Sequence, residues 1–168
     1  FVRAIRSASP KETILIEGVN QIGYVCRIGY PVYTHDGYIT SSYFGNLGFA
    51  YPTALGAKVA APDRPVVCIS GDGGFLFNSQ EMATAMQYGI HVVVVVFNDN
   101  AYGNVYRDQL KKYDGRVIAS KLQNPDFVKL AKSYGMDALR INEPNELETE
   151  LSKAINRNRS CLIEVSVG

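Results

Sequence analysis

The fold of this chain is decided by three short pieces of its sequence: GDGG at 71–74, VVVVVF at 92–97 and NDN at 98–100. The apolar run at 66–70 and the run at 92–97 lack the alternation of a half-exposed strand. They therefore predict two buried, parallel strands. Because open α/β sheets bind ligands at the carboxyl ends of their strands, the polar residues after each strand are expected at one shared site.

The polar pieces suit a site for an anion and a metal ion. Glycines let backbone N–H groups approach an anion closely, and Asp72 offers a carboxylate to a metal. Asp99 brings a second carboxylate from the next strand end. Taken alone, GDGG could be an ordinary turn, and Asp99 could equally be a turn-forming residue. A dinucleotide fingerprint does not fit, because Phe75 and Leu76 stand where a third glycine is needed.

Along the rest of the chain, strand-like runs alternate with helical ones. The expected strands are 13–16, 66–70, 92–97, 138–141 and 161–167, and the expected helices are 20–28, 48–61, 78–88, 127–134 and 145–156. Asn78 is expected to cap the third helix, and Gly89 and Gly135 to end the third and fourth. This order predicts an α/β fold, a doubly wound and mostly parallel sheet with helices on both faces.

Composition narrows the possible partners. With 46% hydrophobic residues among 168, the chain suits a single domain with a full core. The 17 basic residues nearly balance the 16 acidic ones, so there is no electrostatic reason to expect a nucleic acid or a membrane surface. No apolar run in the sequence has transmembrane length. The first residue is Phe1 rather than Met, which indicates a fragment of a larger, multi-domain protein.

Three cysteines, Cys26, Cys68 and Cys161, are far apart in the sequence and lack the spacing of a metal site. The second and third fall within apolar, strand-like runs. We expect all three to be buried, unpaired thiols in a reducing compartment, the cytoplasm.

The three pieces resemble the signature of the thiamine diphosphate-dependent enzymes, in which GDG is followed by a couple of dozen residues and an Asn-rich ending. Here 24 residues, 74 to 97, separate Gly73 from Asn98. The resemblance extends to GNLGFAYPTALGAK at 45–58, NPDFVKLA at 124–131 and LIEV at 162–165. It implies that residues 1–168 are a single C-terminal, diphosphate-binding domain, similar to that of acetolactate synthases, benzoylformate decarboxylases and pyruvate decarboxylases.

The resemblance implies that the cofactors are thiamine diphosphate and Mg²⁺. The implied metal ligands are Asp72, Asp99 and the backbone carbonyl of Ala101, and oxygen ligands are those that Mg²⁺ prefers. The family more often has Asn at the position of Asp99, so this chain brings a second negative charge to the ion. A helix beginning near Asn78 is expected to help neutralise the diphosphate. The implied cofactor contacts in these loops are Gly71, Gly73, Gly74, Tyr102 and Gly103.

Two further positions have implied roles toward the cofactor rings. Leu47 matches the residue that presses between the two rings and bends the cofactor, although a lone Leu without the surrounding GNLG would indicate only core packing. Gly45 matches the position whose backbone carbonyl accepts a hydrogen bond from the pyrimidine amine. The family's activating Glu belongs to the pyrimidine-binding domain of a partner subunit. No catalytic residue is therefore expected in this chain, and the isolated chain is expected to be inactive.

Asn104 is the candidate for contact with the substrate, and a polar surface position is the competing interpretation. Val105 stands where simple pyruvate decarboxylases have an acid, and Asn104 and Asp108 replace a Met and a Trp of acetolactate synthases. The resemblance implies decarboxylation of a small 2-oxo acid, with possible carboligation, in a homodimer or homotetramer. A catalytically inert cofactor-binding or assembly domain is the alternative. The thiamine-binding subunit of a 2-oxo acid oxidoreductase is disfavoured, because no cysteine spacing suits an iron–sulfur cluster.

Overall fold

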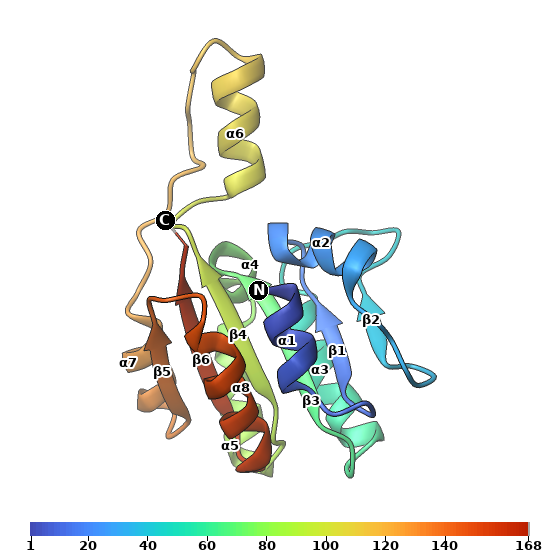
Figure 1. Ribbon diagram of the computed structural model, residues 1–168. Coiled ribbons are helices and arrows are strands. Elements are labelled where there is room, and N and C mark those ends of the chain that lie inside the picture. Colours follow the sequence, from blue (N-terminus) through green and yellow to red (C-terminus); the bar gives the residue numbers. More distant parts are fainter. Residues whose placement is uncertain (168) are drawn as a thin grey trace.

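A computed structural model describes residues 1–167 and has a six-stranded sheet at its centre (Figure 1). The strands lie in the order β2-β1-β3-β4-β6-β5, and every neighbouring pair is parallel. Their bounds are β1 Ile14–Glu17, β2 Tyr38–Thr40, β3 Val66–Gly71, β4 Val93–Asn98, β5 Asp137–Ile141 and β6 Cys161–Ser166. The predicted doubly wound sheet is confirmed, and it is entirely parallel.

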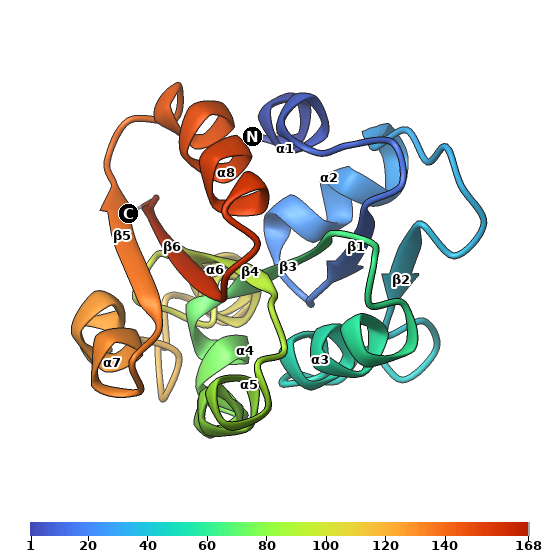
Figure 2. The ribbon, with the colours of Figure 1, turned by 90° about the horizontal axis from the view of Figure 1, so that it is seen from below.

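Helices cover both faces of the sheet. Figure 2 shows α1, α2 and α8 on one face and α3, α4, α5 and α7 on the other. The helices are α1 Val2–Ala8, α2 Gln21–Gly29, α3 Ala50–Ala60, α4 Asp72–Leu76, α5 Met82–Tyr88, α6 Gly103–Lys112, α7 Phe127–Ser133 and α8 Glu146–Asn156, with a 3₁₀ turn, η1, at Ser79–Glu81. Among the helices of residues 1–167, none is long and apolar enough to cross a membrane.

The continuous valine run is explained by the two apolar layers that it separates. Val94 and Val96 belong to the core beneath α3, α5 and α7, whereas Val93 and Val95 belong to the core beneath α1, α2 and α8. Each of these side chains is at most 4% exposed. Since a fully buried valine contributes about 1.5–3 kcal/mol, a central strand gains stability from apolar residues on both of its faces.

Most of the elements expected from the sequence are present, with shifts of one or two residues at their ends. The side chain of Asn20 caps α2 by accepting from the N–H of Gly23 at 2.9 Å. Gly89 ends α5 in the left-handed conformation, with φ at 61°. The single capped helix expected from Asn78 is wrong, because η1 precedes α5 and the Asn78 amide donates to the carbonyl of Gly48 at 2.8 Å instead of capping.

The chain reverses its winding direction at β1. From β1 it runs through α2 to β2 on one side, and β3 then lies on the other side of β1. Helices α2 and α3 therefore lie on opposite faces of the sheet (Figure 2). The connections diverge at the carboxyl ends of β1 and β3, and such a switch point is where open α/β sheets bind their ligands.

The three cysteines are buried and unpaired, as expected. Burial is the main reason that the pKa of Cys26 rises to about 12 and that of Cys161 to about 11, from an ordinary value of 9.0. A raised thiol pKa stabilises the fold below the unfolded value, and this stabilisation is lost as the pH rises through the folded value. Stability should therefore decline from about pH 9 toward pH 12.

Thiol alkylation tests this expectation. At pH 8 the thiolate fraction of Cys161 should be about 100-fold smaller in the native protein than in the unfolded one, since two pKa units separate the two states. Iodoacetamide labelling followed by mass spectrometry should therefore modify Cys161 slowly until denaturant is added. Equal labelling rates with and without denaturant would show that this thiol is accessible and unperturbed.

Candidate functional site

Strand β3 carries Asp72 to the carboxyl edge of the sheet. Helix α4 begins directly at Asp72, whose side chain is enclosed, with only 2% of the residue exposed. A Cβ on Gly73 would lie 2.5 Å from a ring carbon of Tyr102. Glycine at this position therefore leaves room for the ring of Tyr102, from the loop that follows β4, to pack directly on the backbone of α4.

The carboxyl group of Asp72 is held by several donors. The Asn124 side-chain amide donates to its Oδ2 at 2.6 Å. Burial raises the pKa of Asp72 above its ordinary value, and the neighbouring Asp99 adds to this effect. Hydrogen bonds from Asn124 and from the N–H of Gly73 act in the opposite direction. A cation between the two carboxylates would favour their ionised forms, because opposite charges lower the pKa of an acid.

Strand β4 places Asp99 beside Asp72. Gly71 pairs with Phe97 across β3 and β4, so the residues that follow these strands start from neighbouring positions. Asp99 Oδ1 accepts from the N–H of Ala101 at 3.2 Å, and a Cβ on Gly103 would lie 2.6 Å from Asp99 Oδ2. Gly103 thus leaves space for the Asp99 carboxylate against the backbone of the loop.

The loop after β4 is fixed by a short antiparallel bridge between Ala101 and Lys121. The N–H of Tyr102 donates to the carbonyl of Ser120 at 2.8 Å, and the N–H of Leu122 donates to the carbonyl of Asn100 at 2.7 Å. The residues that flank Ala101 therefore make the bonds of this bridge. The carbonyl of Ala101 is not used in it and can accept from another group or bind a metal ion.

A cavity of about 500 Å³ opens at this edge of the sheet, next to the switch point. It brings together every site residue singled out from the sequence. Those residues are Gly45, Leu47, Gly71, Asp72, Gly73, Gly74, Asp99, Ala101, Tyr102, Gly103 and Asn104. The helix that opens on the cavity is α4 rather than one beginning near Asn78, whose side chain is bound to Gly48, so that part of the expectation is wrong.

Leu47 and Gly45 reach the cavity from the segment before α3. A Cβ on Gly74 would lie 3.7 Å from a methyl carbon of Leu47, which puts this side chain in van der Waals range of the GDGG turn. Gly45 has φ at 57°, in the left-handed region that favours glycine. Leu47 is half-buried rather than enclosed in the core, so part of its side chain faces open space.

Another wall of the cavity was not predicted from the sequence. It consists of the loop after β1 and the first turn of α2, with Val19, Asn20, Gln21, Ile22 and Tyr24. A Cβ on Gly71 would approach the Cβ of Asn20 to 3.3 Å, so the two strand ends are in close contact. The available signal was the position of this segment directly after a buried strand, where a parallel sheet binds its ligands.

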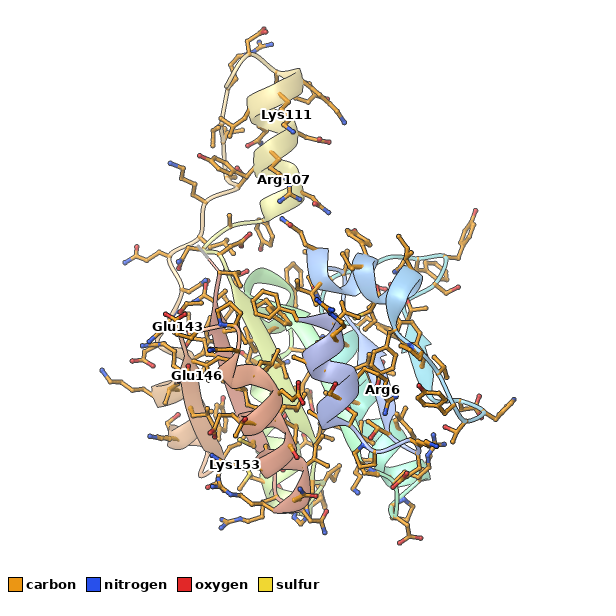
Figure 3. All side chains as sticks on the ribbon, viewed as in Figure 1. Arg6, Arg107, Lys111, Glu143, Glu146 and Lys153 are labelled. Carbon is orange, nitrogen blue, oxygen red and sulfur yellow. The ribbon has the colours of Figure 1, made fainter. Side chains whose placement is uncertain are left out.

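Helix α6 extends beyond the carboxyl ends of the strands and stands apart from the rest of the domain (Figure 1). None of its residues is buried. Asn104 is exposed and also lines the cavity. Figure 3 shows Arg107 on the lower half of α6. Its guanidinium donates to the side-chain oxygen of Asn104. When the Gln21 amide is oriented with its oxygen toward Arg107, that oxygen accepts from Nη2 at 3.0 Å.

The isolated position of α6 predicts rapid hydrogen exchange. Without a bound cofactor, the amides of α6 should exchange at least roughly 1,000-fold faster than those of β4, because α6 has no buried side chain and can open without unfolding the sheet. Exchange followed by mass spectrometry would measure this difference. Protection in α6 as strong as in β4 would contradict it.

A sequence profile described as "Thiamine pyrophosphate enzyme, C-terminal TPP binding domain" matches residues 19–165. The probable acetolactate synthase large subunit of Methanococcus aeolicus is 39% identical over 158 residues, which make up 94% of this chain and 26% of that protein. The acetolactate synthase isozyme 3 large subunit of Escherichia coli K12 is 42% identical over 153 residues, or 89% of this chain and 27% of that protein.

Among solved structures, the Rhodococcus jostii RHA1 thiamine diphosphate-dependent 4-hydroxybenzoylformate decarboxylase matches with a TM-score of 0.90 and 26% sequence identity. This match covers 99% of the present chain and 32% of that one. The chain thus spans about a quarter of the length of the two synthase subunits. Since the profile matches nearly all of the sheet that carries the cavity, this chain belongs to the thiamine pyrophosphate enzymes and corresponds to their C-terminal TPP-binding domain.

Proposed function

We propose that the cavity binds the diphosphate end of thiamine diphosphate through a Mg²⁺ ion. The observation that carries the proposal is the convergence of two carboxylates, Asp72 and Asp99, from neighbouring strand ends on one cavity of a TPP-binding domain. Together with the carbonyl of Ala101, they form a set of oxygen ligands that suits Mg²⁺, which usually shares its shell with substrate phosphates and water.

The glycines on both sides of the carboxylates suit the diphosphate itself. The N–H of Gly73 already donates to the Asp72 carboxylate, and that of Tyr102 donates to the carbonyl of Ser120. Gly74 and Gly103 offer further N–H groups at the starts of α4 and α6. Such N–H groups lack partners within their own helix and can donate to phosphate oxygens. The absence of side chains at the glycines lets the phosphate come near the backbone.

Leu47 and Gly45 complete the half of the site that this chain supplies. When bound, thiamine diphosphate supplies a stabilised carbanion equivalent for chemistry at a carbonyl carbon. Leu47 would pack against the bound cofactor, and the carbonyl of Gly45 would accept a hydrogen bond from its pyrimidine amine. The acid that activates the pyrimidine ring would come from the pyrimidine-binding domain of a partner subunit, so the domain described here is expected to be inactive by itself.

For the full-length protein, we propose decarboxylation of a small 2-oxo acid, with possible carboligation to a second carbonyl compound. The similarity to acetolactate synthase large subunits and to a 4-hydroxybenzoylformate decarboxylase supports this reaction class. Asn104, at the mouth of the cavity, is the residue proposed to contact the substrate. Activity with pyruvate and with benzoylformate, each with and without an acceptor aldehyde, would distinguish the two reactions.

The proposed partner is a second copy of the full-length protein, in a cytoplasmic homodimer or homotetramer. Large apolar side chains lie exposed on α2 and in the loop that leads to the cavity, with Ile28 92%, Tyr43 97% and Phe44 88% exposed. Large apolar side chains that are exposed in a single chain can be covered in an interface. The free thiols are consistent with the reducing environment of the cytoplasm.

Metal dependence tests the cofactor proposal. Titration calorimetry of the full-length protein should detect binding of thiamine diphosphate in the presence of Mg²⁺ and a loss of binding in EDTA, because the carboxylates would repel the diphosphate without a cation. This chain alone should bind weakly or not at all, since it lacks the pyrimidine pocket. Tight binding in EDTA would contradict the roles proposed for Asp72 and Asp99.

A further inference from the structure

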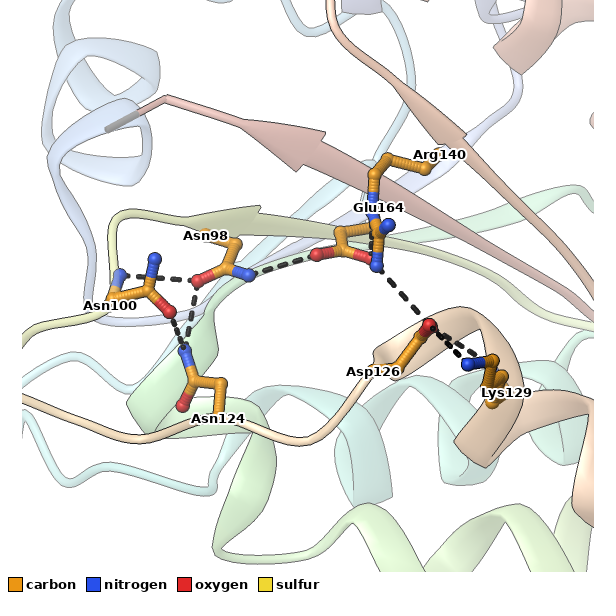
Figure 4. A network of polar contacts seen from close by, with 7 residues as sticks. All are labelled: Asn98, Asn100, Asn124, Asp126, Lys129, Arg140 and Glu164. Carbon is orange, nitrogen blue, oxygen red and sulfur yellow. Dashed lines mark hydrogen bonds and ion pairs between the residues drawn. The ribbon is translucent and has the colours of Figure 1, made fainter.

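Asn124 lies at the centre of a hydrogen-bond network behind the two carboxylates. Its amide nitrogen is 2.6 Å from Asp72 Oδ2, 2.8 Å from Asn98 Oδ1 and 3.4 Å from Asn100 Oδ1. Figure 4 shows Asn124 facing Asn98 and Asn100 across the end of β4. An amide nitrogen has two hydrogens, so the two shorter contacts, to Asp72 and Asn98, occupy both.

The direction of this network is set by a buried charge on β6. Glu164 is 2% exposed and, as a carboxylate, can only accept, so the Asn98 amide presents its nitrogen to Glu164 Oε1 at 2.8 Å. Asn98 must then present its oxygen to Asn124, which in turn must present its nitrogen. The second hydrogen of that nitrogen is thereby directed at Asp72.

Arg140 fixes the other end of the network. Its Nε donates to Glu164 Oε2 at 2.8 Å, and its Nη2 lies 3.3 Å from Asp126 Oδ1 (Figure 4). Asp126 also caps α7 by accepting from the N–H of Lys129 at 3.0 Å. Asn124 is therefore on a short segment that is anchored at Asp126 on one side and at Leu122 on the other.

Within residues 1–167 the oxygen of the Asn124 side chain is buried and has no hydrogen-bond partner. Turning the amide over would not relieve this, because the oxygen would then face the three oxygens that the nitrogen now contacts. An unpaired buried acceptor costs about 1–3 kcal/mol. Three other buried side-chain oxygens among residues 1–167, in Thr13, Ser41 and Tyr51, also have no partner, but only that of Asn124 belongs to an amide whose nitrogen contacts Asp72.

We propose that Asn124 is a positioning residue that fixes the Asp72 carboxylate before the metal ion binds. The network Glu164–Asn98–Asn124 holds one oxygen of Asp72 and so restricts rotation of the carboxylate at the edge of the cavity. Outer-shell partners of metal ligands act in this way, and their loss typically lowers metal affinity 10–100-fold, as an order of magnitude. This inference rests on the proposed role of Asp72 as a metal ligand.

The sharpest test replaces Asn124 by an acid of the same shape. Asn124→Asp puts a carboxylate oxygen against three acceptor oxygens, so the dissociation constant of Mn²⁺, measured by electron paramagnetic resonance in the full-length protein with thiamine diphosphate, should rise about 10–100-fold. The matched control is Asn145→Asp, an identical change at an exposed residue directly before α8. The control should bind Mn²⁺ like the wild type.

Asn124→Ala extends the test without adding charge. It removes the donor, so Mn²⁺ affinity should fall here as well, and kcat should recover to within about twofold of wild type at saturating Mn²⁺ because the metal then orders Asp72 itself. Wild-type Mn²⁺ affinity in Asn124→Ala would overturn the proposal. A kcat that stays low at saturating Mn²⁺ would also overturn it, since that result indicates a general structural role.

The variant Asp72→Asn tests the proposed metal site separately from the proposed positioning role of Asn124. If Asp72→Asn loses Mn²⁺ binding while Asn124→Asp binds as tightly as the control or more tightly, Asp72 is a ligand and the positioning role of Asn124 is wrong. If Asp72→Asn itself binds Mn²⁺ like the wild type, the proposed metal site is wrong, and the inference about Asn124 is overturned with it.

Discussion

Replacing Asp72 with Ala in the full-length protein should abolish metal-dependent retention of thiamine diphosphate and, with it, enzymatic activity. Asp72 is enclosed where β3 ends, and the other carboxylate that lines the cavity, Asp99, is held by its own bond to the backbone of Ala101. Among residues 1–167, no third carboxylate lines the cavity to substitute for the lost ligand. Gel filtration followed by quantification of bound cofactor would measure the loss.

Asp99→Asn is the matched control for this result. The amide oxygen can still coordinate Mg²⁺ and can still accept from the N–H of Ala101, so cofactor retention should change less than about tenfold. It should also relieve the repulsion between two neighbouring carboxylates in the metal-free protein. Full activity in Asp72→Ala, or an equal loss in both variants, would contradict the assignment of the two ligands.

Leu47→Ala should lower kcat about 100-fold while the concentration of thiamine diphosphate for half-maximal activity changes much less. Metal and diphosphate would still anchor the cofactor, but the rings would lose the side chain that holds their bent shape. Loss of such orientation falls mainly on the chemical step and can reach a factor of about 100. Steady-state kinetics at several cofactor concentrations separate the two quantities.

Leu130→Ala provides the comparison for this variant. Leu130 is also a half-buried leucine, but it packs against the core from α7, away from the cavity. The Leu130→Ala protein should be less stable than the wild type, because the substitution leaves a void in the core, and it should keep the wild-type kcat. If the kcat of Leu47→Ala equals that of Leu130→Ala, the proposed role of Leu47 toward the cofactor is wrong and Leu47 only packs against its neighbours.

The central sheet could be predicted because its strands are defined by local composition. Val93 to Val96 are apolar on both faces, and only a strand covered on both sides buries such a run. Helix ends were found where a single residue signals them, as Gly89 does with its positive φ. Because open α/β sheets bind ligands at the carboxyl ends of their strands, the residues after β3 and β4 could be predicted to share one site.

The elements that could not be predicted depend on contacts between distant residues. The turn at Asn78 is set by Gly48, thirty residues earlier in the chain. Strand β2 has three half-buried residues and no pattern of its own, and it exists because it pairs with β1. Helix α6 has no buried residue, so no contact with the core of this domain specifies it.

The same distinction holds for the site. Asp72 and Asp99 were found because each directly follows a strand, whereas Asn124 was noted only as part of a family-like segment. Its side chain reaches Asp72 across fifty-two positions of sequence. The α2 wall of the cavity, including Asn20, was missed for a similar reason, since its packing against Gly71 follows from the strand order rather than from any local motif.

The most direct measurement is a crystal structure of the full-length protein with thiamine diphosphate and Mn²⁺, in which anomalous scattering locates the metal. The account predicts one ion in the cavity, at about 2.0–2.2 Å from carboxylate oxygens of Asp72 and Asp99, from the carbonyl of Ala101 and from two diphosphate oxygens. A metal bound elsewhere, or a diphosphate in the cavity with no ion between it and Asp72, would contradict it.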